Sequence, residues 1–368
     1  PPGGGLDSEG PMVQRTCLVT GGAGFIGTEL LRRTRGQYDR LVVLDSLLPQ
    51  VHATPPELPE GVELVVGDVA DASAWTEVVG ALRDADRLDV VHLAAETGTG
   101  QSLAEPSRHA LANVVGTTRL TEALDAASAR PDRIVLASSR AVYGEGAWSF
   151  DGELRYPGQR GVEQLSAGQW DFPGAEPVAM QADRVHPDPV SVYGATKLAQ
   201  EHLLAAWCVA HDVPLTVLRL QNVYGVGQSL TNSYTGILPL FCRIAREGRS
   251  IPLYEDGLVR RDFVHVSDVV AAMRAALATT KPGVDTLDVG SGEYATVEHV
   301  AGVIAEAYGS PAPQVSGDFR HGDVRHAWAD TSRTESALGW APTVPLDAGL
   351  RELVAWVDDV LGAEAAAR

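Results

Sequence analysis

Short hydrophobic runs alternate with longer amphipathic stretches along the first 220 residues of the chain. The runs are rich in Val, Ile and Leu, which is typical of strands buried on both faces, and they cover residues 15–20, 40–45, 62–69, 88–95, 133–139 and 215–220. Between them, helical spacing of apolar residues predicts helices over residues 25–36, 75–84, 108–128 and 194–212. The alternation predicts an α/β fold, a Rossmann-like doubly wound parallel sheet with helices on both faces.

Two parts of the chain do not follow this alternation of strand and helix patterns. Residues 145–188 carry glycines, prolines and aromatic residues without a clear period, and the aromatic residues favour an ordered flap over a disordered loop. The last third mixes strand and helix patterns, which predicts a smaller mixed α/β unit at the C-terminus. We expect a Rossmann domain over residues 12–220, with 145–188 as an insert and 262–292 returning to it, and a substrate domain over 221–261 and 293–364.

Charge and cysteine content narrow the class of protein. The net charge of −19 disfavours nucleic acid and anionic membranes as partners, because both repel an acidic surface. No apolar run approaches the ~20 residues of a membrane helix, so we expect no membrane association. Cys17, Cys208 and Cys242 lie far apart without the spacing of metal ligands. This favours a reduced, cytoplasmic protein without a metal site.

A glycine pattern follows the first predicted strand and opens the first predicted helix. Gly21, Gly24 and Gly27 permit a tight turn, a close approach of a pyrophosphate to the helix N-terminus, and close packing of helix on strand. Asp45 ends the second strand 18 residues after Gly27, and a carboxylate there binds ribose hydroxyls and repels a 2′-phosphate. The pattern predicts a dinucleotide site that favours NAD over NADP. A plain glycine-rich loop and an ordinary turn aspartate are the alternatives.

A tyrosine and a lysine lie one helical turn apart in "VSVYGATKLAQE". Tyr193 and Lys197, at positions i and i+4, share one helix face, and Lys197 is one of only two lysines in the chain. An ammonium group lowers the pKa of a neighbouring phenol and prepares it to act as a base. Ser139, at the end of a predicted strand, provides a hydroxyl for the substrate oxygen that the tyrosine deprotonates. Solvated side chains and an ordinary serine turn are the alternatives.

These features occur together with further motifs, namely "LVTGGAGFIG", "HLAAETGTGQS", "LRLQNVYG" and "RDFVHVSDV". The combination resembles the extended short-chain dehydrogenase/reductase family, specifically its nucleotide-sugar epimerases and dehydratases. The resemblance implies an enzyme with a tightly held NAD, a nucleotide-diphosphate sugar as substrate, and a homodimer built from the helices at 107–127 and 194–211. It adds as cofactor-binding candidates Phe25, Ile26, Ser46, Asp68, Val69, Leu93, Ala94, Ala95 and Asn113. It adds as substrate-binding candidates Gln101, Asn222, Arg261 and Arg320, with Arg325 behind them and residues 252–257 near the base.

The stretch "SSRAVYG" distinguishes between the reactions of this family. The 4,6-dehydratases resemble T-D-E-V-Y-G there, with the aspartate and glutamate as acid and base for elimination. This chain has Arg140 and Ala141 at those positions, and neither side chain accepts a proton at neutral pH. The resemblance therefore implies epimerisation at C4 through a transient 4-keto sugar. The finer pattern is similar to the branch of dTDP-L-rhamnose 4-epimerases, which interconvert that sugar with dTDP-6-deoxy-L-talose.

Other functions stay open at this point. A dehydratase, a decarboxylase or a ketosugar reductase of the same family is the first alternative. A Rossmann-fold sensor that binds NAD without catalysis is the second, although such proteins tend to lose the tyrosine or the lysine. The choice between thymine and uracil as the base, and so between a dTDP- and a UDP-sugar, is also open.

Overall fold

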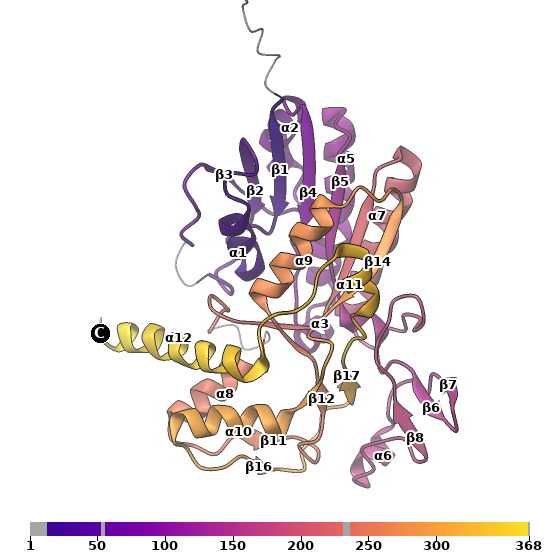
Figure 1. Ribbon diagram of the computed structural model, residues 1–368, viewed down its shortest axis with the longest axis vertical. Coiled ribbons are helices and arrows are strands. Elements are labelled where there is room, and N and C mark those ends of the chain that lie inside the picture. Colours follow the sequence, from indigo (N-terminus) through magenta and orange to yellow (C-terminus); the bar gives the residue numbers. More distant parts are fainter. Residues whose placement is uncertain (1–12, 53–55, 231–235, 367–368) are drawn as a thin grey trace, which may run out of the picture.

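The computed structural model describes residues 13–52, 56–230 and 236–366. Seven parallel strands form one sheet in the order β14-β9-β5-β4-β1-β2-β3, so the strand order reverses between β1 and β4 (Figure 1). This arrangement confirms the predicted Rossmann-like fold, and the carboxyl ends of the strands form the edge where such folds bind ligands. The strands are β1 (Arg15–Thr20), β2 (Arg40–Asp45), β3 (Val62–Val66), β4 (Arg87–His92), β5 (Arg133–Ser139), β9 (Leu215–Leu220) and β14 (Val284–Val289).

Helices cover both faces of this sheet (Figure 1). Val78, Leu120 and Leu204 of α2, α5 and α7 are buried against one face, and Leu30 and Val270 of α1 and α9 are buried against the other. Two separate hydrophobic cores therefore enclose the strands, which explains why the strands are apolar throughout. The helices of these layers are α1 (Phe25–Thr34), α2 (Trp75–Arg83) preceded by the short η1 (Ala72–Ala74), α5 (Gly116–Ala127), α7 (Val192–His211), α9 (Val266–Ala278) and α11 (Ser332–Leu338).

The helix predicted over residues 108–128 is not one continuous α-helix. It consists of α4 (Pro106–His109), the π-helical segment η2 (Ala110–Val115) and α5, and it follows the short α3 (Thr99–Ala104). The side chain of Asn113 in η2 accepts a hydrogen bond from Glu96 N at 2.8 Å and donates one to Glu96 O at 3.0 Å. These hydrogen bonds occur where the helix has its wider π-helical turn. The spacing of hydrophobic residues indicates neither the bonds nor the wider turn.

A second lobe lies below the sheet in Figure 1 and has its own hydrophobic core, formed by α8, α10 and α12. None of the helices within the described ranges, the 21-residue α12 included, is long and apolar enough to cross a membrane. We propose that the chain divides into two domains with the boundaries predicted from the sequence. The elements of this lobe and of its junction with the sheet are α8 (Ile237–Arg246), α10 (Val297–Tyr308), α12 (Leu346–Ala366), β10 (Asn222–Tyr224), β11 (Pro252–Leu253), β12 (Arg260–Arg261), β13 (Phe263–His265), β15 (Ala295–Thr296), β16 (Gln314–Val315) and β17 (His326–Ala327).

The 145–188 insert is ordered around a small antiparallel sheet and one short helix. Trp148 is buried and meets the Phe172 ring edge-on, with 5.0 Å between ring centroids. Arg160 is buried as well and forms ion pairs with Glu145 at 3.0 Å and with Glu255 of the second lobe at 2.8 Å. The Arg160–Glu255 ion pair fastens the insert to the second lobe. Its elements are β6 (Trp148–Phe150), β7 (Glu153–Arg155), α6 (Val162–Ser166) and β8 (Ala175–Pro177).

Candidate active site

A cavity of about 1030 Å³ lies along the carboxyl ends of the strands, and residues of both lobes line it. Most of the candidate residues from the sequence lie on its wall. These are Gly21, Gly24, Phe25, Ile26, Gly27, Asp45, Ser46, Asp68, Val69, Leu93, Ala94, Ala95, Ser139, Tyr193, Asn222, Arg261 and Arg320. Gln101, Asn113 and Lys197 lie behind the wall. The fold thus brings residues from Gly21, directly after the first strand, to Arg320 together around one cavity.

The glycine loop between β1 and α1 forms one end of the cavity. Gly21 has a φ of +70°, and a Cβ atom there would lie 2.7 Å from the backbone nitrogen of Ala94. A Cβ atom on Gly27 would lie 2.6 Å from the Cα of Gly22, so the helix can approach the loop only because residue 27 lacks a side chain. The wall is therefore bare backbone at the N-terminus of α1, which suits a pyrophosphate group.

Replacing Gly27 with alanine is expected to lower the free energy of unfolding by about 1–3 kcal/mol, because the added methyl group meets backbone that cannot move aside. The amount of NAD retained by the purified protein is expected to fall as well. Gly80→Ala is the matched control, since a Cβ on this exposed α2 glycine meets no atom within 4 Å. The prediction is wrong if both variants unfold at the same denaturant concentration and retain equal NAD.

Asp45 lies at the end of β2, beside the glycine loop. Its Oδ2 accepts a hydrogen bond from Ala23 N at 3.0 Å, and its Oδ1 accepts one from Leu47 N at 2.9 Å. Two backbone bonds hold the carboxylate in one orientation, and each carboxylate oxygen still has acceptor capacity toward the cavity. The bare glycine wall and this oriented carboxylate together fit the pyrophosphate and the adenosine ribose of NAD.

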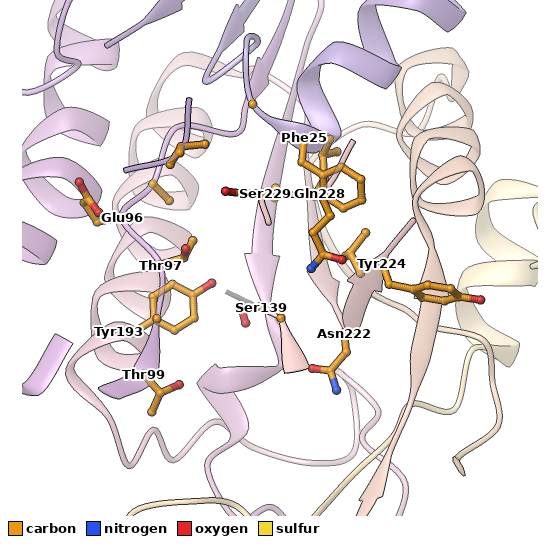
Figure 2. A pocket seen from close by; sticks show the side chains of 18 of the residues that line it. Phe25, Glu96, Thr97, Thr99, Ser139, Tyr193, Asn222, Tyr224, Gln228 and Ser229 are labelled. Carbon is orange, nitrogen blue, oxygen red and sulfur yellow. The ribbon is translucent and has the colours of Figure 1, made fainter. Parts of the chain in front are cut away.

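Tyr193 and Ser139 face each other across the middle of the cavity (Figure 2). Ser191 caps the N-terminus of α7 through a 3.0 Å bond from Gly194 N, which sets Tyr193 in the first helical turn. Burial raises the pKa of Tyr193 above its ordinary value, whereas the Ser139 hydroxyl and the positive charge of Arg140 lower it. The pair combines a phenol with a hydroxyl at the end of β5, and the nearby cation favours ionisation of that phenol.

Lys197 is buried one turn further along α7 and points to Gln200. Its Nζ donates a 2.6 Å hydrogen bond to Gln200 Oε1, and Gln200 Nε2 donates one of 2.8 Å to Thr117 Oγ1. Burial lowers the pKa of Lys197 to about 7. Sequence reasoning missed Gln200, although its position three residues after Lys197 places both on one helix face. The groups that lower the Tyr193 pKa are the Ser139 hydroxyl and then the positive charge of Arg140, a cation that the Tyr193–Lys197 spacing does not indicate.

Adjacent residues Ser138 and Ser139 have different surroundings. The Ser138 hydroxyl donates a hydrogen bond to Glu201, and Glu201 accepts two bonds from the Arg219 guanidinium at 3.0 and 2.7 Å. Tyr143, on the other side of the loop, donates a 2.7 Å bond to Asp288. This buried network fastens both ends of the "SSRAVYG" stretch, and Ser139 lies on the cavity wall between them.

The arginines of the cavity differ in their partners. Arg140 Nε donates a 3.0 Å hydrogen bond to Asn222 Oδ1, and Arg261 donates bonds to backbone carbonyl groups. The guanidinium group of Arg320 lies 5.0 Å from the centre of the Tyr254 ring. Arg325 is buried and paired with acidic residues of both the insert and the second lobe, so it acts as a structural cation behind the wall.

Gln101 and Asn113 reach the cavity only through other residues. Gln101 exchanges hydrogen bonds with Gln50 at 2.9 and 3.3 Å, and Gln50 lines the cavity in its place. Asn113 holds the backbone of Glu96, which also lines the cavity. Within the described part of the chain, no group of three His, Cys, Asp or Glu side chains is arranged to hold a metal ion.

Comparison with known proteins shows the family to which the chain belongs. The profile of the NAD dependent epimerase/dehydratase family matches residues 17–290. The dTDP-L-rhamnose 4-epimerase of Burkholderia thailandensis is 56% identical over 347 residues, which cover 93% of this chain and 95% of that protein. The structure of MoeE5 in complex with UDP-glucuronic acid and NAD has a TM-score of 0.73 and 30% identity, over 94% of this chain and 99% of that chain. UDP-glucose 4-epimerase from Thermotoga maritima, solved with UDP-glucose, has a TM-score of 0.76 and 26% identity over the same shares. The protein therefore belongs to the NAD-dependent epimerase/dehydratase family.

Proposed function

We propose that this protein catalyses NAD-dependent epimerisation at C4 of a nucleotide-activated sugar through a transient 4-keto sugar. The observation that carries the proposal is the cavity wall at the end of β5, where Ser139 and Tyr193 stand beside Arg140 and Ala141 rather than beside an acid and a base. The 56% identity to a dTDP-L-rhamnose 4-epimerase supports a dTDP-6-deoxyhexose as the substrate, interconverted between the L-rhamnose and 6-deoxy-L-talose forms.

The cofactor candidates suit NAD. The backbone of the glycine loop would hold the pyrophosphate, Asp45 the ribose hydroxyls, and Asp68 and Val69 the adenine side of the cavity. When bound, NAD supplies a hydride acceptor that later returns the hydride to the other face of the sugar. Lys197, buried with its ammonium held by Gln200, would hold the nicotinamide ribose.

The protein's own side chains would handle the proton. Tyr193 would accept it from the C4 hydroxyl and return it when the hydroxyl is re-formed, while the Ser139 hydroxyl hydrogen-bonds the same oxygen. Elimination of water across C5 and C6 needs a further acid and base beside the sugar. At the two positions where the dehydratases have them, this chain offers a guanidinium and a methyl group.

We also propose a cytoplasmic homodimer. Leu111 and Val209 are exposed on η2 and α7, which is consistent with a partner covering the helices expected at the dimer interface. The three cysteines are buried free thiols, in keeping with a reducing compartment.

A panel of nucleotide sugars tests the proposed reaction. Incubation with dTDP-L-rhamnose is expected to produce dTDP-6-deoxy-L-talose at equilibrium, observed by NMR, without added NAD and without accumulation of a 4-keto-6-deoxy sugar. The matched UDP-sugars and dTDP-glucose serve as comparison substrates. Accumulation of a 4-keto-6-deoxy product would identify a dehydratase, and absence of any conversion across the panel, with NAD bound, would favour a non-catalytic sensor.

A further inference from the structure

Two arginines of the cavity wall have no carboxylate partner. Arg140 and Arg261 both line the cavity, and within the described residues neither forms an ion pair. Their hydrogen bonds go instead to an amide oxygen and to backbone carbonyls. Two fully buried cations nearby, Arg160 and Arg325, are each paired with Glu255. Among these four arginines, the two without an ion pair are therefore the two that line the cavity.

The donors of this arginine pair are only partly used by the protein. An arginine carries five N–H donors, and Arg140 uses its Nε–H on Asn222. Its Nη1 and Nη2 hydrogens have no protein partner in the described part of the chain. Arg261 donates to the carbonyls of Arg260, Arg325 and Val324 at 2.8, 3.0 and 2.6 Å, which fixes the plane of its guanidinium. The Arg261 guanidinium is thus held in one orientation, and Arg140 near it keeps N–H donors that the protein does not use.

The two like charges also oppose each other. Burial and, next, the positive charge of Arg140 lower the pKa of Arg261 to about 9. Carboxylates do attract both arginines, Asp323 and Asp262 in the case of Arg140, and Asp323, Glu145 and Glu255 in the case of Arg261. Within the described residues, none of them forms an ion pair with either arginine. A desolvated charge without a close partner is unfavourable in the free protein, and a bound anion removes this cost.

We propose that Arg140, together with Arg261, forms a two-arginine clamp for the diphosphate of the nucleotide sugar. The proposal rests on the proposed function for the class of substrate. It gives Arg140 a role at the position where the dehydratases have their acid. Two guanidinium groups match the two negative charges of a diphosphate, and arginine forks bind phosphate oxygens through paired hydrogen bonds. Asn222 keeps the Arg140 side chain directed along the wall.

Binding of dTDP without a sugar tests this clamp. Arg140→Met is expected to weaken dTDP binding by about 10- to 100-fold, measured by calorimetry, because a charge-assisted contact is lost. Arg261→Met is expected to do the same, and Arg140→Lys is expected to lie between the wild type and Arg140→Met. Arg155→Met is the control, since this exposed arginine pairs with Glu153 in the insert, away from the cavity. Unchanged dTDP affinity in Arg140→Met would overturn the proposal, and because no turnover is measured, that result is separate from a failure of the epimerase assay.

Thermal unfolding distinguishes a ligand-binding arginine from a structural one. Without ligand, Arg140→Met is expected to unfold at the same temperature as the wild type or higher, because a partly buried charge without an ion pair is removed. Saturating dTDP is expected to raise the unfolding temperature of the wild type more than that of the variant. A lower unfolding temperature without ligand, with an equal gain from dTDP, would show that Arg140 only supports Asn222. Weaker binding of a dTDP-uronic acid with unchanged dTDP binding would assign Arg140 to a sugar carboxylate and overturn the clamp.

Discussion

Replacing Tyr193 with phenylalanine is expected to lower turnover by about 10²- to 10⁴-fold, the range that a positioned general base contributes. The substitution keeps the aromatic ring in the first turn of α7 but removes the hydroxyl that faces Ser139 (Figure 2). In the proposed reaction the Tyr193 hydroxyl is the group that accepts the proton of the C4 hydroxyl, so its removal leaves that step without a base. Steady-state epimerisation of dTDP-L-rhamnose, followed by NMR, measures the effect.

The test also requires evidence that the Tyr193→Phe variant is folded and contains bound NAD. Tyr193→Phe is expected to retain NAD and to unfold within a few degrees of the wild type. Tyr294→Phe is the matched control, because this exposed tyrosine packs on Trp328 outside the cavity, and its turnover should equal that of the wild type. Activity of Tyr193→Phe within tenfold of the wild type would exclude Tyr193 as the base.

Replacing Glu201 with glutamine is expected to lower the free energy of unfolding by about 3–5 kcal/mol. Glu201 and Arg219 are both buried, and the neutral amide would leave the Arg219 guanidinium without its carboxylate. The loss should also loosen Ser138 and with it the loop that carries Ser139. Chemical denaturation measures the stability, and turnover is expected to fall together with it.

An exposed pair provides the comparison. Glu63 forms two hydrogen bonds with Arg40 on the surface, so Glu63→Gln is expected to cost about 0–1 kcal/mol. Ser138→Ala, which removes one hydrogen bond and leaves the ion pair, is expected to cost about 1 kcal/mol. Equal effects of Glu201→Gln and Glu63→Gln would show that burial of the Glu201–Arg219 pair does not govern its contribution.

Several features were predictable because they depend on neighbours in the sequence. The strands were recognised from local runs of β-branched residues, and the glycine loop and Asp45 from spacing within one β-α-β unit. Tyr193 and Lys197 were recognised because a separation of four residues places them on one helix face.

Other features were missed because they join residues far apart in the sequence. The wider helical turn at Asn113 coincides with bonds to Glu96 across 17 positions. Arg140 donates a hydrogen bond to Asn222 across 82 positions, whereas the sequence indicates only that Arg140 cannot act as the acid of a dehydratase. The aromatic residues of the insert favour an ordered flap, yet nothing local indicates that Arg160 pairs with Glu255.

By itself, the sequence determined the α/β class and the local positions of the glycine loop, Asp45 and the Tyr193–Lys197 pair, because hydrophobic period and short spacings are local properties of the chain. Only the tertiary structure decided what surrounds those residues. It separated Ser138, bound to Glu201, from Ser139, on the cavity wall, and it turned Lys197 toward Gln200. It also placed Arg140 and Arg261 near each other without an ion pair to a carboxylate, because charge balance inside a fold depends on which distant segments meet there.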